Sequence, residues 1–232
     1  MTRRVLGLVP ARGGSKGVPN KNLRPLAGSS LLHLVRDAAR ASGVIDRLVL
    51  STDSLAIAEA GRACGLELPF MRPSELATDD APMLPVIEHA IGALEAGGWS
   101  PDLILLLQPT APLRRGSHIS DAAALLTESG ADAVATVVEL PRHLSPDYVM
   151  RIADGRLVNF LPEGARVTRR QDARSAFVRD GTVYAFWRRT LVESGSIYGR
   201  DCRPLFVATE DSLTIDTEAD WAEAERRMRE RV

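Results

Sequence analysis

The segment after the first apolar run carries the residues best suited to chemistry. It reads Pro10-Ala11-Arg12-Gly13-Gly14-Ser15-Lys16-Gly17 and continues to Lys21 and Asn22. Of the 29 lysines and arginines in the chain, only Lys16 and Lys21 are lysines, and both lie here. A lysine ammonium is a compact charge that suits phosphate, and clustered glycines let backbone N–H groups approach an anion closely. The segment therefore predicts a polyphosphate site.

The alternative for this segment is a solvated glycine-rich turn. Arg12, Lys16 and Lys21 have no acid between them, so they would repel one another without a bound anion, which favours the phosphate site. The spacing is neither Gly-x-Gly-x-x-Gly nor Gly-x-x-x-x-Gly-Lys-Ser/Thr. A dinucleotide site and a P-loop are therefore both disfavoured.

Two later segments also carry polar side chains beside apolar runs. Gln108-Pro109-Thr110 follows the run at 103–107, where we expect a strand to end and ligands to bind. In Thr214-Ile215-Asp216, period-two alternation directs residues 214 and 216 to the same side of an extended chain. Only Asp216 of that pair can ligate a metal as an anion, and one carboxylate can suffice for Mg²⁺ when phosphate oxygens and waters complete its shell. The alternative for Gln108 is an amide that ties down its own proline-rich turn, and the alternative for Asp216 is an aspartate that caps a helix.

Alternating strand and helix patterns must position these segments. Apolar β-type runs occupy 5–10, 47–51, 103–107, 133–138 and 182–187, and helical patterns occupy 31–42, 55–64, 83–96 and 119–128, with a last helix after Thr217. The alternation predicts a Rossmann-like α/β fold, a mostly parallel sheet with helices on both faces. Its ligand crevice should open at the carboxyl ends of the strands.

Residues 139–179 interrupt the alternation. Asp154-Gly155 between two short β-type runs predicts a hairpin, and Arg166, Arg169, Arg170 and Arg174 follow within nine positions. We expect an inserted arm that acts in dimerisation or as a substrate lid, on a core formed by residues 1–138 and 180–232. A solvated basic loop is the alternative.

Composition excludes several classes of protein. The chain has 232 residues, 45% of them hydrophobic, and no apolar run approaches the roughly 18 to 20 residues that cross a bilayer. A formal net charge of −1 argues against a nucleic-acid or membrane partner. Cys64 and Cys202 lie far apart, without the spacing of a disulfide framework or a zinc site. Two reduced thiols predict a cytoplasmic protein.

Five blocks of sequence together point to a family. They are the segment 10–23, Ser51-Thr52-Asp53, Arg72-Pro73-Ser74-Glu75-Leu76-Ala77, Leu107-Gln108-Pro109-Thr110-Ala111-Pro112-Leu113-Arg114 and Ser212-Leu213-Thr214-Ile215-Asp216-Thr217. In this order they resemble the CMP-sialic acid synthetases (acylneuraminate cytidylyltransferases) and the wider sugar nucleotidyltransferases that include CMP-Kdo synthetase. The resemblance implies a homodimeric, Mg²⁺- or Mn²⁺-dependent cytidylyltransferase. It would join CMP from CTP to an acidic 2-keto-3-deoxy sugar, sialic acid or a related nonulosonic acid, and release pyrophosphate.

The resemblance also implies roles for individual residues. Nucleotide contacts fall to Ala11, Arg12, Gly13, Gly14, Ser15, Lys16, Asn22 and Arg72, catalysis to Arg12, Lys16, Lys21 and Asp216, metal ligation to Asp216, and sugar contacts to Gln108, Thr110, Arg170 and Gln171. Arg170 and Gln171 match positions of a dimerising arm that in some members reaches toward the sugar acid from the partner subunit. For Arg72 a helix cap or a pair with Glu75 is the alternative, and for Asp53 a helix cap is favoured.

Some positions depart from the family pattern. Thr214 stands where an Asp is common, Ala111 departs from the pattern of its own block, and Val178-Arg179-Asp180-Gly181 stands where Arg-Pro-Asn-Gly is frequent. The acceptor therefore stays open. The alternatives are a nucleotidyltransferase for another acid, such as a Kdo-like sugar or a phosphonate, and a non-catalytic homologue that binds a nucleotide or a sugar acid.

Overall fold

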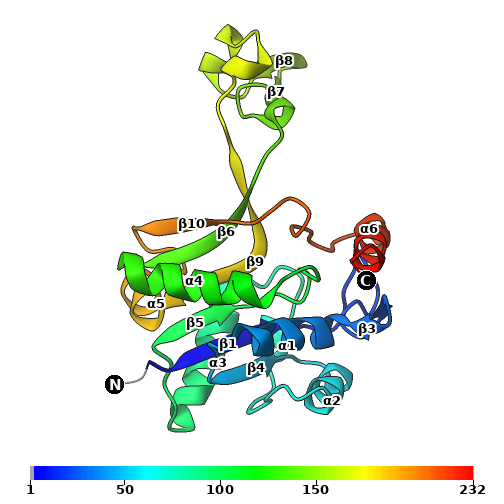
Figure 1. Cartoon of the computed structure of the whole chain (residues 1–232), viewed down its shortest axis with the longest axis vertical. Coiled ribbons are helices and arrows are strands. Elements are labelled where there is room, and N and C mark those ends of the chain that lie inside the picture. Colours follow the sequence, from blue (N-terminus) through cyan, green and yellow to red (C-terminus); the bar gives the residue numbers. More distant parts are fainter. Residues whose placement is uncertain (1–2, 232) are drawn as a thin grey trace.

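A computed structural model describes residues 3–231 (Figure 1). The strands are β1 Val5–Pro10, β2 Pro25–Leu26, β3 Ser29–Ser30, β4 Arg47–Ser51, β5 Leu103–Leu106, β6 Ala133–Glu139, β7 Met150–Ala153, β8 Arg156–Asn159, β9 Phe177–Trp187 and β10 Cys202–Phe206. The α-helices are α1 Leu31–Ser42, α2 Leu55–Ala63, α3 Met83–Ala96, α4 Gly116–Ser129, α5 Arg188–Ser194 and α6 Glu218–Arg229. Short 3₁₀ turns are η1 Ser74–Leu76, η2 Arg142–Leu144, η3 Pro162–Arg166 and η4 Arg170–Asp172.

A six-stranded sheet forms the centre, in the order β10-β6-β9-β5-β1-β4. β1 is parallel to both β4 and β5, and β10 is parallel to β6, whereas β9 runs antiparallel between β5 and β6. All four residues of β5 are buried, as expected for a strand covered on both faces. Because β1, β4 and β5 are parallel, their carboxyl ends meet at one edge of the sheet.

Helices cover both faces of the sheet. α1, α2 and α4 contribute to one apolar core, while α3 and α5 contribute to a second core on the opposite face. α6 lies apart, where its buried Trp221 and Ala224 pack with Val18 and Ile215 (Figure 1). The predicted Rossmann-like α/β fold, with a mostly parallel sheet and helices on both faces, is therefore confirmed.

Side-chain caps fix where α2 and α6 begin. Thr217 and Asp220 form a capping box at the start of α6. The prediction that Asp53 caps α2 is wrong, because Ser54 accepts the N–H of Ile57 there. The Asp53 carboxylate instead accepts the N–H of Gly13 at 2.8 Å, which leaves it to hold the loop after β1.

The chain between β6 and β9 extends away from the sheet (Figure 1). Its β7–β8 hairpin is a separate two-stranded sheet, and its turn residues Asp154 and Gly155 both have positive φ, 50° and 71°. Within this arm, the buried Asp147 carboxylate accepts two bonds from the Arg174 guanidinium, at 2.9 and 2.5 Å, and one from the Arg174 backbone N–H at 2.8 Å. The Arg174 bonds hold the pKa of Asp147 below its usual range.

Among the residues that the structure describes, no helix combines the length and apolar character needed to cross a bilayer.

Candidate functional site

A hollow of about 520 Å³ opens at the carboxyl ends of β1 and β5. Nine of the predicted site residues line it: Arg12, Ser15, Lys16, Lys21, Asn22, Arg72, Gln108, Thr110 and Asp216. Pro10, Gly17, Asp79, Met83, Pro109 and Thr214 complete the lining. Segments more than 200 residues apart in the sequence thus meet in one pocket, at the sheet edge where ligands are expected.

The loop after β1 packs directly on the segment before α6. Gly17 makes this possible, since a Cβ at that position would overlap the carbonyl oxygen of Asp216. The Lys21 ammonium donates to the carbonyl of Ile215 at 3.0 Å and lies 3.9 Å from the Asp216 carboxylate. Burial lowers the pKa of Lys21, and Asp216 partly opposes that shift. This contact sets a cation and a carboxylate side by side in the pocket.

Asp79, from the turn before α3, also lies in the pocket. Its two carboxylate oxygens pair with the Arg12 guanidinium at 2.6 Å and the Lys16 ammonium at 2.5 Å. Hydrogen bonds from Lys16, then Arg12, lower the pKa of Asp79. The expectation that these cations repel one another without a bound anion is therefore wrong for Arg12 and Lys16, because Asp79, about 60 residues further along the chain, pairs with both.

Buried polar contacts fix the floor of the pocket. Arg72 donates to the hydroxyl and the carbonyl of Ser51, at 3.1 and 2.6 Å, and its burial lowers its pKa to about 10. It neither caps a helix nor pairs with Glu75, so both alternatives for Arg72 are wrong. The Asn22 amide donates to the carbonyl of Arg12 at 3.2 Å, which orients the start of the loop.

The turn after β5 is held from behind by Arg114. Its buried guanidinium donates to the carbonyls of Gln108 and Thr182, both at 2.5 Å, and burial lowers its pKa to about 9. The Gln108 side-chain amide makes no hydrogen bond within residues 3–231, so it does not tie down its own turn. Gly181, with φ +75°, leaves room beside it, because a Cβ there would lie 3.1 Å from its amide oxygen. The Gln108 amide is thus available to a ligand.

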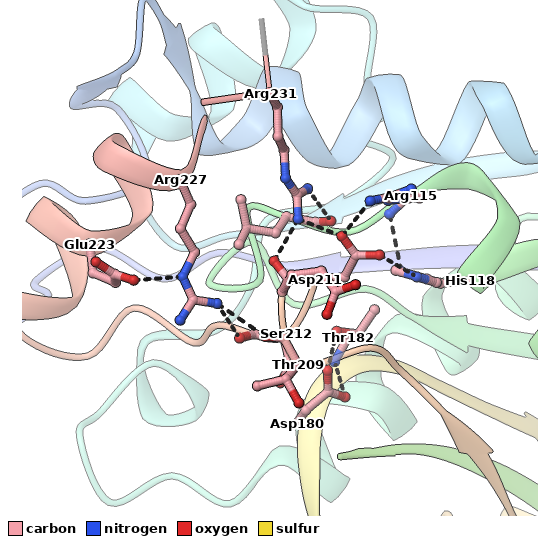
Figure 2. A network of polar contacts seen from close by, with 12 residues as sticks. Arg115, His118, Asp180, Thr182, Thr209, Asp211, Ser212, Glu223, Arg227 and Arg231 are labelled. Carbon is pink, nitrogen blue, oxygen red and sulfur yellow. Dashed lines mark hydrogen bonds and ion pairs between the residues drawn. The ribbon is translucent and has the colours of Figure 1, made fainter. Parts of the chain in front are cut away.

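A second polar network holds the segment that carries Thr214 and Asp216 (Figure 2). The Asp211 carboxylate, 7% exposed, pairs with Arg115 at 2.7 Å, with Arg231 and, at 3.6 Å, with the His118 ring. Arg227 adds hydrogen bonds to the carbonyls of Thr209 and Ser212. Burial lowers the pKa of His118 despite the opposing Asp211. These contacts tie α6 and the start of α4 to the loop before the pocket.

The donors around Asp216 suit a metal that arrives with phosphate oxygens. In the described part of the chain, no three His, Cys, Asp or Glu side chains cluster as a metal cage. The Asp216 carboxylate is 74% exposed and faces the pocket, whereas the Thr214 hydroxyl already donates to the carbonyl of Asp180 at 2.9 Å. One exposed carboxylate fits Mg²⁺ or Mn²⁺ only if a ligand supplies most of the remaining oxygens.

Five predicted residues do not line this pocket. Ala11 is buried in the core with its N–H on Ser51, and Gly13 gives its N–H to Asp53. Gly14, at φ +66°, turns the loop and meets nothing at its Cβ position. Arg170 and Gln171 are exposed on the arm, in η4.

Asp79 is a carboxylate of the pocket lining that was not predicted from the sequence. Its available signal was the acidic pair Asp79-Asp80 just before an amphipathic helix.

Comparison with known proteins shows that the chain is similar to cytidylyltransferases over nearly its whole length. A family model described as cytidylyltransferase matches residues 6–189. The CMP-N,N'-diacetyllegionaminic acid synthase of Legionella pneumophila is 31% identical over 228 residues, covering 97% of this chain and 96% of that protein. The N-acylneuraminate cytidylyltransferase A of Danio rerio is 32% identical, and this chain spans about half (51%) of its length.

Solved structures share the fold. The structure of CMP:2-keto-3-deoxy-manno-octonic acid synthetase complexed with CTP superposes with a TM-score of 0.73 at 16% identity, covering 99% of this chain and 100% of that one. The 4-diphosphocytidyl-2C-methyl-D-erythritol synthase of Anaerococcus prevotii gives a TM-score of 0.68 at 12% identity, with 99% and 100% coverage.

Proposed function

The chain belongs to the cytidylyltransferase family, and from this premise we propose that it transfers CMP from CTP to the anomeric hydroxyl of an acidic 2-keto-3-deoxy sugar, sialic acid or a related nonulosonic acid. One observation carries the proposal: Arg12, Lys16, Lys21 and Asp216 converge on one pocket although they come from opposite ends of the chain. The Legionella relative, matched over nearly its full length, is named for a CMP-linked acid of this kind.

The pocket residues act by positioning and by charge. The acceptor oxygen attacks the α-phosphorus, the bond from that phosphorus to the bridging oxygen breaks, pyrophosphate leaves, and the hydroxyl proton passes to water. Negative charge grows on the bridging and leaving oxygens, so fixed cations stabilise the transition state. Arg12 and Lys16 grip the triphosphate, Lys21 faces the leaving group, and Arg72 and Asn22 hold the nucleotide side of the pocket.

Asp216 would hold the divalent ion. When bound, Mg²⁺ or Mn²⁺ neutralises phosphate charge and orients the phosphate oxygens. Lys21, 3.9 Å from the same carboxylate, keeps Asp216 turned toward the phosphate loop. Thr214, through its bond to the carbonyl of Asp180, fixes the strand-like path that leads to Asp216.

The acceptor meets Gln108 and Thr110 at the end of β5. Arg170 and Gln171 would complete its site from the arm of a second copy in a homodimer, where a bidentate arginine could bind the sugar carboxylate. The arm supports this role because it exposes apolar side chains, Ile152 at 79% and Leu157 at 68%, that a single copy leaves in contact with water.

A pyrophosphate-release assay tests the proposal. The purified chain, with Mg²⁺, is given each of the four nucleoside triphosphates and a panel of acids: nonulosonic acids, an eight-carbon keto-deoxy sugar acid and a phosphonate. We expect release with CTP and a nonulosonic acid. Release with a different acid would overturn the acceptor assignment, and no release with any pair would favour a binding protein without catalysis.

A further inference from the structure

Two cations of the phosphate loop already hold an anion of the protein itself. Asp79 bridges them, one carboxylate oxygen on the Arg12 guanidinium at 2.6 Å and the other on the Lys16 ammonium at 2.5 Å. A phosphate group that uses two of its oxygens would present the same pattern to the same two side chains. The carboxylate therefore stands where the proposed function needs phosphate oxygens.

The bridge shares the pocket with the Lys21–Asp216 pair but differs from it in where its acid comes from and in how exposed its cations are. It lies inside the pocket, and its acid comes from the turn 77–82 between η1 and α3, most of which is exposed. The Arg12 and Asp79 side chains are about one-third exposed and that of Lys16 is 79% exposed, so water can reach all three groups. Exposed pairs of this kind are weak and reversible. A multiply charged phosphate can therefore displace this carboxylate.

We propose that Asp79 is an internal placeholder for phosphate: its carboxylate neutralises Arg12 and Lys16 in the free protein, gives way to the triphosphate of the substrate, and returns as pyrophosphate leaves. This inference rests on the proposed function for the identity of the ligand. Every anion that takes this position must first displace Asp79. The apparent affinity of the anion therefore equals its intrinsic affinity multiplied by the fraction of molecules in which Asp79 has moved away. The same factor weakens the hold on pyrophosphate, which favours product release.

Calorimetric titration with inorganic tripolyphosphate and with pyrophosphate, in the absence of metal, tests the placeholder. Asp79→Asn removes the charge that bridges the two cations. Asp80→Asn is the matched control, since it removes the same charge from the next position of the same turn, and the structure gives Asp80 no ion pair. We expect D79N to bind both anions about three- to tenfold more tightly than the wild type does, the size of one or two surface ion pairs. D80N should stay close to the wild type.

Three results would overturn the placeholder: equal affinities for D79N and D80N, weaker binding by D79N, or no measurable binding by all three proteins. Melting curves of the variants establish that each is folded, and exposed positions such as these tolerate an Asp→Asn change. The outcome is independent of turnover. If D79N binds tripolyphosphate more tightly and no acid supports pyrophosphate release from CTP, the proposed function fails while the placeholder stands.

Discussion

The pocket and the arm are built on opposite principles. The pocket gathers charged groups from distant segments and holds each by a defined contact, such as Lys21 on the carbonyl of Ile215 and Arg72 on Ser51. The arm is continuous in sequence, and besides local contacts such as that of Asp147 with Arg174 it exposes apolar side chains and arginines to solvent. The pocket is thus preorganised within one chain, whereas the arm leaves several apolar side chains in contact with water.

The largest effect is expected where the pocket acts directly on phosphate. Lys16→Ala removes a cation from the proposed triphosphate grip, and kcat should fall by about 10²- to 10³-fold, the usual cost of losing one transition-state charge stabiliser. Affinity for CMP, which lacks the leaving phosphates, should change little. Steady-state kinetics with a CMP-binding titration checks both. Turnover near the wild-type value in Lys16→Ala would remove this residue from the mechanism.

The sequence was informative for the pocket because its segments follow strands. Once alternating patterns place β1 and β5 in a parallel sheet, the residues after Pro10 and after Leu107 must lie at the same edge. Asp79 could not be placed in the same way, since the path of the turn 77–82 depends on how η1 and α3 pack. The bonds of Asp211 to Arg115 and Arg231 depend likewise on where the end of α6 meets the start of α4.

In the central sheet and the helices that cover it, β10 and α5 were not predicted, for local reasons. β10 contains Pro204 and Arg203 and lies at the edge of the sheet, where a proline is tolerated and the apolar alternation is weak. α5 spans only seven residues, too few for a helical period to be recognised. β9 begins at Phe177, five residues before the predicted strand, so the sheet takes in the last residues assigned to the arm. The arm boundaries at 139 and 179 remain a prediction.

A pair of adjacent arginines tests whether the arm completes the sugar site. Arg170→Ala should raise KM for the acidic sugar about 10- to 100-fold, the worth of a charge-assisted bidentate bond, and leave KM for CTP unchanged. Arg169→Ala is the control, because Arg169 pairs with Asp172 at 2.7 Å on the arm itself. Equal effects of the two variants would argue that the arm contributes only general positive charge.

The alkaline side of the pH profile distinguishes the pocket's buried cation from its exposed ones. Burial lowers the pKa of Lys21, so its ammonium loses its proton at lower pH than that of an exposed lysine, and the positive charge is lost as pH rises. We expect kcat/KM for CTP to fall along the alkaline limb of the pH profile, as Lys21 loses its proton. Lys21→Arg keeps its charge throughout and should move the limb to higher pH, at a lower rate near neutrality because a guanidinium fits the carbonyl of Ile215 less well. An unmoved limb would assign it to another group.

The smallest expected effect concerns the missing second carboxylate. Thr214→Asp places two carboxylates on one side of the segment that ends at Asp216, so the Mg²⁺ concentration for half-maximal rate should fall several-fold. The gain is limited because the new carboxylate faces the carbonyl of Asp180, to which the Thr214 hydroxyl now donates at 2.9 Å. Thr214→Asn has nearly the same shape without the charge and can donate to that carbonyl, so it should leave the Mg²⁺ requirement unchanged. If both variants shift it equally, geometry rather than charge at position 214 controls the metal, and Asp216 alone supplies the anionic ligand of this pocket.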